Sequence, residues 1–352
     1  MKVLVTGGAG FLGRHLVAAL QERGDMVRVF DRPSPHTERL AERGVAIYPG
    51  DIRQPASLVA PMQGADAVVH LAGMTGVWAG LDEYYAVNVT GTENVCRAAL
   101  MSGASRLVHI SSWIVYGMGI GRPAEEDFPL APLNEPCSVT KTLGDRLVQR
   151  MIAEDQLPAT IIRPDTIIGP GDYVHIGRIA DRLLAGRGVI AGSGRNAMPF
   201  VYVADVVQGL LLALDRPEAV GQAYNIGHDQ PITQGELLRA IAEEVGARPP
   251  RIRVPYSVLY AAACFAEQAA RLTHSVRKPV LTRLGVAIFG ADNRHAIGKA
   301  RRELGYSPAV PVREGIRRGA AWYRQECISE EAALSVAAGR RSEKGSSLNA
   351  RS

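Results

Sequence analysis

The chain has 352 residues, more than twice the roughly 150 of a typical domain, so we expect one large domain or two closely joined domains. Its composition, 47% hydrophobic and 21% charged, is that of a globular protein and argues against a disordered chain. The formal net charge is only +5, but residues 248–324 hold fifteen Lys or Arg against four Asp or Glu. Such a region is typical of a solvated surface, or it faces an anionic substrate, an anionic membrane or nucleic acid.

Targeting and metal-binding signals are missing from the sequence. No stretch reaches the ~18 uninterrupted apolar residues of a membrane-spanning helix, and the start of the chain has no signal-peptide pattern. The four cysteines, at positions 96, 137, 264 and 327, include no C-x-x-C pair. We therefore expect a cytoplasmic protein with neither a disulfide framework nor a metal site.

Apolar β-branched runs alternate with helical periodicity through the first half of the chain. The pattern predicts strands at 2–5, 27–31, 45–48, 67–71, 107–110 and 159–163, and helices at 11–23, 83–102 and 138–154. This alternation predicts an α/β fold, a doubly wound parallel sheet of the Rossmann type with right-handed crossovers. A further strand at 199–203 and a helix at 204–214 are expected to return to this sheet.

Pro and Gly become frequent after residue 165, which suggests a smaller C-terminal substrate-binding domain over the carboxyl edge of the sheet. We expect residues 1–165 and about 197–216 in the first domain, and residues 166–196 and 217–328 in the second. Residues 329–352 lack periodicity and are predicted to be a disordered tail.

A glycine motif connects the first predicted strand to the first helix. Gly7, Gly10 and Gly13 form G-x-x-G-x-x-G, which lets backbone N–H groups approach a pyrophosphate at a helix N-terminus. Asp31 ends the second strand, where a carboxylate accepts both ribose hydroxyls of adenosine and repels a 2′-phosphate. The sequence therefore predicts NAD rather than NADP, although the adjacent Arg32 could stack on adenine or contact a phosphate.

Over nearly all of residues 1–325 the chain resembles the extended short-chain dehydrogenase/reductases, the NAD-dependent epimerase/dehydratase family. The resemblance is carried by residues 6–13, 50–53, 70–73, 88–92, 111–117, 140–141, 163–164 and 169–172. It implies a homodimer formed through the helices near 83–102 and 138–154. It also implies further cofactor contacts from Phe11, Leu12, Asp51, Ile52, Leu71, Ala72, Gly73, Asn88, Lys141, Arg163 and Pro164.

The resemblance also implies a reaction centre of Ser, Tyr and Lys around the nicotinamide, and one member differs here. Ser112 matches the residue that donates a hydrogen bond to the substrate oxygen, and Lys141 matches the lysine that holds the nicotinamide ribose. Position 137, where the tyrosine is expected, is Cys. The chain is then a natural variant using another acid or water, a laboratory substitution of a tyrosine enzyme, or a cofactor-binding protein without redox turnover.

Two groups are candidates for the missing acid. The Cys137 thiol is acidic enough, with a reference pKa near ~8.5, but it reaches roughly 4 Å less far than a phenol, so it would need a water relay. Asp165, after Arg163 and Pro164, is the other candidate, although an Asp at this position more often caps a loop or pairs with a neighbour such as Arg163.

Residues that are typical of two sugar-nucleotide branches of this family are missing here, which bears on the substrate class. Trp113 and Ile114 stand where sugar-nucleotide 4,6-dehydratases carry Asp-Glu, and Met198 stands where epimerases often carry an Arg, although Arg195 is close by. The second half resembles the 3β-hydroxysteroid dehydrogenase branch, through residues 192–196, 254–271, 299–306 and 322.

We therefore expect an NAD-dependent oxidoreductase that acts on a hydrophobic secondary alcohol or ketone, such as a steroid or polyketide, without a nucleic-acid partner. The alternatives are a sugar-nucleotide epimerase with retained NAD, and a cofactor-bound cyclase, isomerase or sensor. The apolar stretch 254–266, between Arg253 and Arg271, suits a lid, a dimer face or a peripheral membrane contact.

Overall fold

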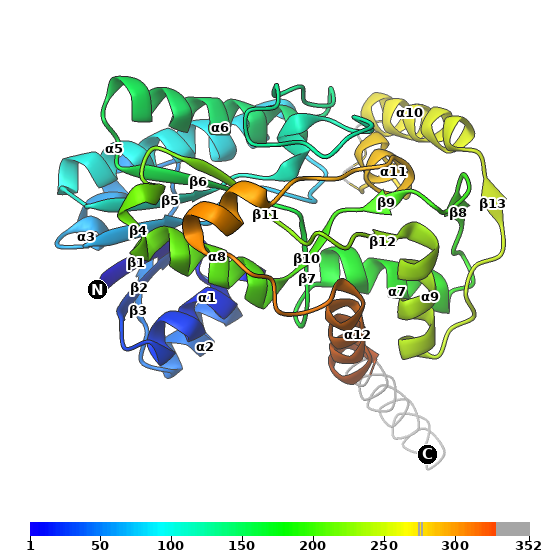
Figure 1. Ribbon diagram of the computed structural model, residues 1–352, viewed down its shortest axis with the longest axis horizontal. Helices are drawn as coiled ribbons and strands as arrows, with labels where there is room; N and C mark the ends of the chain where they lie inside the picture. Colours follow the sequence, from blue (N-terminus) through cyan, green and yellow to red (C-terminus); the bar gives the residue numbers. More distant parts are fainter. Residues whose placement is uncertain (274, 276, 329–352) are drawn as a thin grey trace, which may run out of the picture.

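The computed structural model describes residues 1–273, 275 and 277–328, so the predicted tail at 329–352 lies outside the described residues. A seven-stranded sheet occupies one half of the molecule (Figure 1), in the order β11-β6-β5-β4-β1-β2-β3, and all its strand pairs are parallel. Its strands are β1 (Lys2–Thr6), β2 (Met26–Asp31), β3 (Ala46–Pro49), β4 (Ala67–His70), β5 (Arg106–Ile110), β6 (Ala159–Pro164) and β11 (Ala223–Ile226). The chain order reverses between β1 and β4, which opens a ligand crevice at their carboxyl ends.

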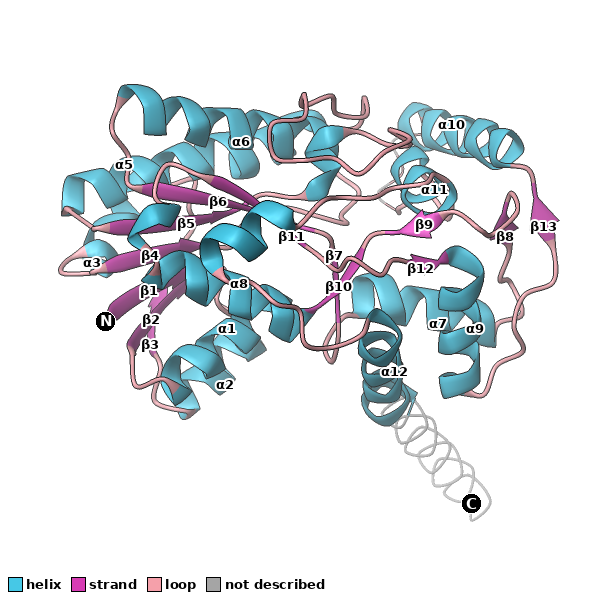
Figure 2. Ribbon diagram, in the orientation of Figure 1, coloured by secondary structure: helices cyan, strands magenta, loops and turns pink. Residues whose placement is uncertain are grey.

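Helices cover both faces of the sheet (Figure 2), as predicted. One face carries α1 (Phe11–Glu22), α2 (Pro35–Glu42) and α8 (Val203–Asp215), and the other carries α3 (Val59–Met62), α5 (Thr92–Ser102) and α6 (Pro136–Glu154). Side chains of β1 alternate between the two cores: Val3 and Val5 pack with α1 and α8, whereas Leu4 packs with α5 and α6. Burial on both faces explains why these strands are almost uniformly apolar.

The helix predicted at 83–102 is interrupted by a wider turn. It consists of α4 (Leu81–Tyr85), the π-helical segment η2 (Ala86–Gly91) and α5, without a break between them. Such π segments occur mostly as single turns inside α-helices, frequently at functional sites. Here the segment contains Asn88.

One strand prediction was wrong. β10 (Phe200–Tyr202) does not join the main sheet but pairs with β7 (Thr166–Ile168) in a separate two-stranded sheet. The edge of the main sheet is β11, from the part of the chain that the sequence assigned to the substrate domain. Short apolar runs of three or four residues carry no signal for which sheet they join, and β7 leaves the main sheet just after β6. The helix α8 does pack on the main sheet, as expected.

The remaining elements form the other half of the molecule around two further apolar cores. They are α7 (Arg178–Leu184), β8 (Ile190–Ala191), β9 (Ala197–Met198), β12 (Ile232–Thr233), α9 (Gln234–Val245), β13 (Arg253–Val254), α10 (Tyr256–Leu272), α11 (Arg283–Gly290) and α12 (Val312–Tyr323). Short helical turns complete the chain: η1 (Pro55–Leu58), η3 (Trp113–Tyr116), η4 (Tyr173–Gly177), η5 (Pro217–Ala219), η6 (Ala300–Leu304) and η7 (Arg324–Ile328). Within the described part of the chain, no helix is both long and apolar enough to cross a membrane.

Candidate active site

The glycine loop between β1 and α1 leaves room for a ligand only because of its glycines. Gly7 has a φ of 72°, and a Cβ there would lie 2.6 Å from the Ala72 nitrogen, so no larger residue fits. A Cβ at Gly10 would meet only the Gly7 carbonyl oxygen, so this residue faces the open side of the loop. No side chain caps the first N–H groups of α1, which leaves them free for an anionic ligand. The loop therefore fits the pyrophosphate of a dinucleotide.

The Asp31 carboxylate lies beside the glycine loop. One oxygen accepts a hydrogen bond from the Ala9 N–H at 3.0 Å, and the other accepts from the Arg32 N–H at 2.8 Å. These bonds fix the carboxylate at the end of β2, where an adenosine ribose binds in this type of fold. The Asp31 carboxylate is therefore positioned to accept the ribose hydroxyls, as predicted. Arg32 contacts this carboxylate through its backbone N–H and not through its guanidinium.

Asp51 and Ile52, the residues expected to border the adenine, follow β3. The Asp51 carboxylate forms an ion pair with Arg53 at 2.6 Å, and hydrogen bonds from this guanidinium hold the pKa of Asp51 below its usual value. The Ile52 side chain is buried against Gly91, since a Cβ on Gly91 would lie 2.6 Å from its Cδ1. Neither residue lines the cavity that contains the glycine loop, so their contact with the adenine stays a prediction.

Asn88 joins the segment after β4 to helix α6. Its side-chain oxygen accepts from the Met74 N–H at 2.7 Å, and its nitrogen donates to the Met74 carbonyl at 3.0 Å and to Thr140 Oγ1 at 3.1 Å. A Cβ on Gly73 would lie 3.3 Å from Asn88 Oδ1 and 3.5 Å from Lys141 Nζ. The structure thus brings Gly73, Asn88 and Lys141 together. Leu71 and Gly73 line the cavity; the intervening Ala72 packs against Gly7.

Lys141 is buried and its Nζ donates to the Ile110 carbonyl at 3.0 Å. Burial lowers the pKa of this ammonium. Ser112 is the N-cap residue of η3, and its hydroxyl oxygen accepts weakly from the Ile114 N–H at 3.4 Å, so the hydroxyl hydrogen is not engaged there. Ser112, Cys137 and Lys141 all line one cavity, as the resemblance implied.

Cys137 is almost fully buried, with 3% of its surface exposed. It packs in an apolar cluster with Tyr84, Trp113 and Ile114. Burial, reinforced by the charge of Glu135, raises the pKa of the thiol to about 12. The thiol is therefore a weaker acid than its reference pKa suggested from the sequence. It stays protonated near neutral pH, a state in which it can donate a proton but not act as a base.

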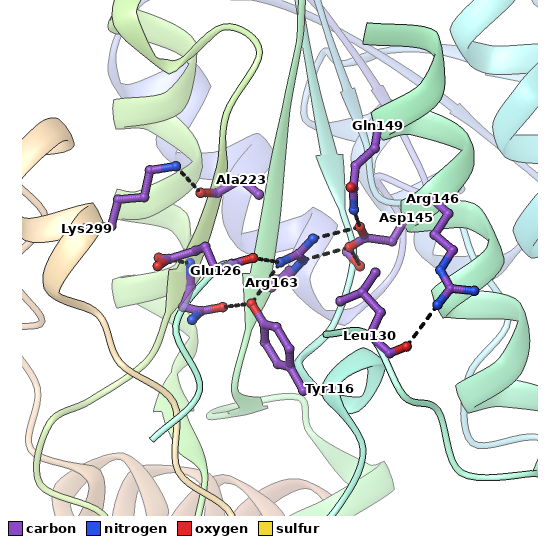
Figure 3. A network of polar contacts seen from close by, with 11 residues as sticks. Tyr116, Glu126, Leu130, Asp145, Arg146, Gln149, Arg163, Ala223 and Lys299 are labelled. Carbon is purple, nitrogen blue, oxygen red and sulfur yellow. Dashed lines mark hydrogen bonds and ion pairs between the residues drawn. The ribbon is translucent and has the colours of Figure 1, made fainter. Parts of the chain in front are cut away.

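Asp165 and Arg163 do not form the pair that the sequence suggested. Asp165 lines the cavity, but one carboxylate oxygen lies 2.5 Å from His295 Nδ1 and the other lies against Gly227. Arg163 points away from the cavity and forms a buried ion pair with Asp145 at 2.9 Å (Figure 3). Of the two residues predicted to contact the cofactor here, only Pro164 lines the cavity.

Arg163, on β6, is the centre of a hydrogen-bond network. Its guanidinium also donates to the Tyr116 hydroxyl and to the Glu126 carbonyl, both at 2.8 Å (Figure 3). Tyr116 donates in turn to Asn225 on β11 at 2.7 Å. This network joins strands β6 and β11 to the loop that follows η3, so it supports the position of the reaction centre without touching a ligand.

One cavity of about 760 Å³ connects these groups. It extends from the glycine loop past Ser112, Cys137 and Lys141 to a wall supplied by the second half of the chain. Apolar lining residues of that second half are Ile179, Leu183, Val189, Leu238, Leu259, Val280, Leu281, Leu284, Val286, Ile288 and Phe289. Such a wall suits a bulky apolar ligand. The described residues include no cluster of His, Cys, Asp and Glu that could hold a metal ion.

The same wall also carries cations that were not predicted from the sequence. Arg178 and Arg182 lie one turn apart on α7, and Lys278 lies on the loop before α11. Two features of the sequence could have indicated them: Arg178 and Arg182 are four residues apart on one helix, and Lys278 is one of few lysines in this chain.

These features define an NAD-dependent enzyme with a two-part cavity, a nucleotide end and an apolar end. Comparison with known proteins identifies the class: residues 3–227 match the NAD dependent epimerase/dehydratase family, and the chain belongs to it. The chain is thus an NAD-dependent enzyme of the extended short-chain dehydrogenase/reductase type.

Relatives with different substrates share the fold. The chain is 34% identical to a 2-alkyl-3-oxoalkanoate reductase of Stenotrophomonas maltophilia, over 90% of this chain and 98% of that protein. It is 34% identical to isoform 1 of the 3beta-hydroxysteroid-dehydrogenase/decarboxylase of Arabidopsis thaliana, over 90% of this chain and 78% of that protein. A dTDP-glucose 4,6-dehydratase of Streptomyces venezuelae, solved with NAD bound, superposes with a TM-score of 0.75 and 28% identity, over 93% and 98% of the two chains.

Proposed function

We propose that the protein catalyses hydride transfer between NAD and a hydrophobic secondary alcohol or its ketone. The observation that carries this proposal is the single cavity that joins the glycine loop, the Ser112–Lys141 pair and an apolar wall. When bound, NAD supplies the hydride acceptor or donor. The glycine loop, Asp31 and the backbone of 71–73 are the groups that would hold it.

The chain's own groups act on the substrate oxygen. The Ser112 hydroxyl is free to donate a hydrogen bond to that oxygen, which polarises a ketone or stabilises the charge of an alcohol losing its proton. Lys141, held by the Ile110 carbonyl, places a positive charge next to the same centre. Both groups favour charge development on the oxygen.

Proton transfer is the step in which this chain differs from the Ser, Tyr and Lys pattern that the family resemblance implies. The protonated Cys137 thiol lies on the cavity wall, and a water between it and the substrate oxygen would complete a relay. Asp165 is a weaker donor because its carboxylate is held by His295 and packed against Gly227. We therefore assign the relay to Cys137.

The apolar wall also supports the choice between substrate classes. The relatives at 34% identity are named as acting on oxoalkanoates and hydroxysteroids, which carry a ketone or hydroxyl on an apolar skeleton. A sugar nucleotide would place hydroxyl groups against Leu284, Ile288 and Phe289 without polar partners. The test is a panel of steroid, polyketide and long-chain hydroxy compounds with NAD, followed by NADH absorbance. A sugar-nucleotide epimerase would instead retain its NAD through purification and form no free NADH.

We further propose a cytoplasmic homodimer that contacts membranes peripherally. Helix α10 supports the membrane contact: Phe265 and Leu272 are 83% and 79% exposed on its outer surface, and Arg271 and Arg277 are exposed close by. A homodimer through α5 and the π-containing helix before it, together with α6, is the arrangement that the family resemblance implies. Met101 at the end of α5 is 88% exposed, which fits a surface covered by a partner.

A further inference from the structure

Three cations converge on the cavity wall beside Cys137. Arg178 Nη1 and Lys278 Nζ both donate to the Gly76 carbonyl oxygen, at 3.4 and 3.1 Å. Arg182 Nη2 donates to the Val280 carbonyl at 2.5 Å. All three residues line the cavity, as does Arg187, and Arg182 and Lys278 are also exposed to solvent. The charge of Arg178 acts on both Arg182 and Lys278, so two segments distant in sequence, α7 and the loop before α11, bring these charges close together.

No carboxylate neutralises these charges. Among the residues that the structure describes, none forms an ion pair with Arg178, Arg182 or Lys278. The acids nearby are engaged elsewhere: Glu135 caps α6, Asp172 caps η4, and Asp181 accepts from Tyr173 and Tyr323.

Arg182 and Lys278 both lie within the influence of the Arg178 charge. Burial and the charge of Arg178 lower the pKa of both Arg182 and Lys278, whereas Glu135 offsets only part of the effect on Lys278. Like charges gathered without a counter-ion destabilise one another, and a bound anion removes that repulsion.

The position of the cluster relates it to the reaction centre. The Gly76 N–H lies close enough to the Cys137 thiol to lower its pKa, and the carbonyl of the same residue accepts from Lys278 and Arg178. A single residue therefore separates the cations from the thiol. An anion bound here would share one cavity with Ser112 and Cys137, and the apolar side chains of Leu284 and Ile288 pack against the cluster that contains Cys137.

We propose that Arg178, Arg182 and Lys278 form a subsite for the carboxylate of an apolar substrate. The substrate class is then a hydrophobic hydroxy acid or keto acid whose carboxylate lies close to the carbon that exchanges hydride. This inference rests on the proposed function for the identity of the reacting carbon, but the subsite itself is testable without turnover. Guanidinium and ammonium groups are the common partners of carboxylates.

The test is equilibrium binding of two probes of equal chain length to the full protein with NAD present. Dodecanoate carries a carboxylate and dodecan-1-ol does not, and titration calorimetry measures both. We expect dodecanoate to bind at least ten-fold more tightly, and Arg178→Gln and Lys278→Gln each to remove most of that advantage while leaving dodecanol affinity unchanged. Arg313→Gln, an exposed arginine outside the cavity, is the matched control and should change neither affinity.

The possible results distinguish a carboxylate subsite from a diphosphate subsite and from no subsite. Equal affinity for the two probes, or dodecanoate binding that survives both substitutions, would overturn the subsite. Tighter binding of UDP than of dodecanoate, with the same dependence on Lys278, would assign the cations to a diphosphate and overturn the carboxylate. If dodecanoate binds as expected but no hydroxy acid yields NADH, the proposed function fails and the subsite stands.

Discussion

Replacing Cys137 by alanine removes the thiol that we assign to proton transfer. A positioned general acid contributes about 10²–10⁴ in rate, and a relay through one water belongs at the lower end of that range. We therefore expect kcat to fall about 100-fold, which corresponds to about 2.7 kcal/mol of activation free energy. Lys141 and Ser112 remain in place, so the affinity for NAD should stay within two-fold.

Two further substitutions at the same position separate chemistry from packing. Cys137→Ser keeps a group that can relay a proton and should recover at least ten-fold of the lost kcat. Cys137→Tyr puts a ring into the cavity next to Trp113 and Ile114, where it occupies the space of the relaying water, so its kcat should also fall. Because Cys137 packs among apolar neighbours, the alanine variant should lose only about 1 kcal/mol of folding stability, within the range for small core truncations.

The assay is steady-state NADH consumption with the ketone of the best substrate from the panel, the direction in which the thiol donates its proton, with NAD affinity measured separately by calorimetry. A Cys137→Ala protein that keeps its kcat within two-fold would refute the relay. A Cys137→Tyr protein whose turnover rises 100-fold would show instead that the chain is a standard tyrosine enzyme that lacks its acid.

Four other predictions concern the cofactor site, the core and the surface. Gly7→Ala should abolish measurable NAD binding because its Cβ meets the Ala72 backbone, whereas Gly24→Ala, with a similar φ of 85° but open space, should bind NAD normally. Calorimetry should show NAD binding at least ten-fold more tightly than NADP, about 1.4 kcal/mol, and Asp31→Ala should erase the difference; equal affinities in the unmodified protein would contradict this. Burial lowers the pKa of His70 and lowers that of His109 to about 3. Both imidazoles therefore stay neutral in the folded protein, whereas in the unfolded chain they bind protons below pH 6.5. Stability is therefore lost as pH falls, by about 1.4 kcal/mol per histidine at pH 5.5, and His109→Phe should flatten this slope in denaturant titrations. Anionic liposomes should sediment the protein at low salt and release it at high salt, and Phe265→Glu should prevent sedimentation.

The parts of the fold that the sequence predicted are those encoded by local patterns. Doubly buried strands such as β4 and β6 are continuous apolar runs, and the glycines at 7 and 13 leave no alternative to a tight strand-to-helix turn. The presence of β11 in the main sheet, with β10 in a separate sheet, was not predictable, because strand pairing depends on contacts between residues far apart in the chain.

The same distinction applies to the site. Ser112, Cys137 and Lys141 lie at fixed spacings around one helix and one strand, so motif matching placed them together. The partners of Asp165 and Arg163 come from residues distant in sequence, His295 and Asp145, and no local pattern indicates either pairing. The cation cluster is likewise assembled only when α7 and the loop before α11 meet.

The most direct test of the central claim is isotope transfer. A substrate from the panel carrying deuterium on the carbon that bears its hydroxyl is incubated with NAD, and the released nicotinamide cofactor is examined by mass spectrometry. The account predicts that one deuterium appears in NADH in proportion to the ketone formed. NADH that lacks the label, or label that returns to the substrate while NAD stays bound, would contradict it.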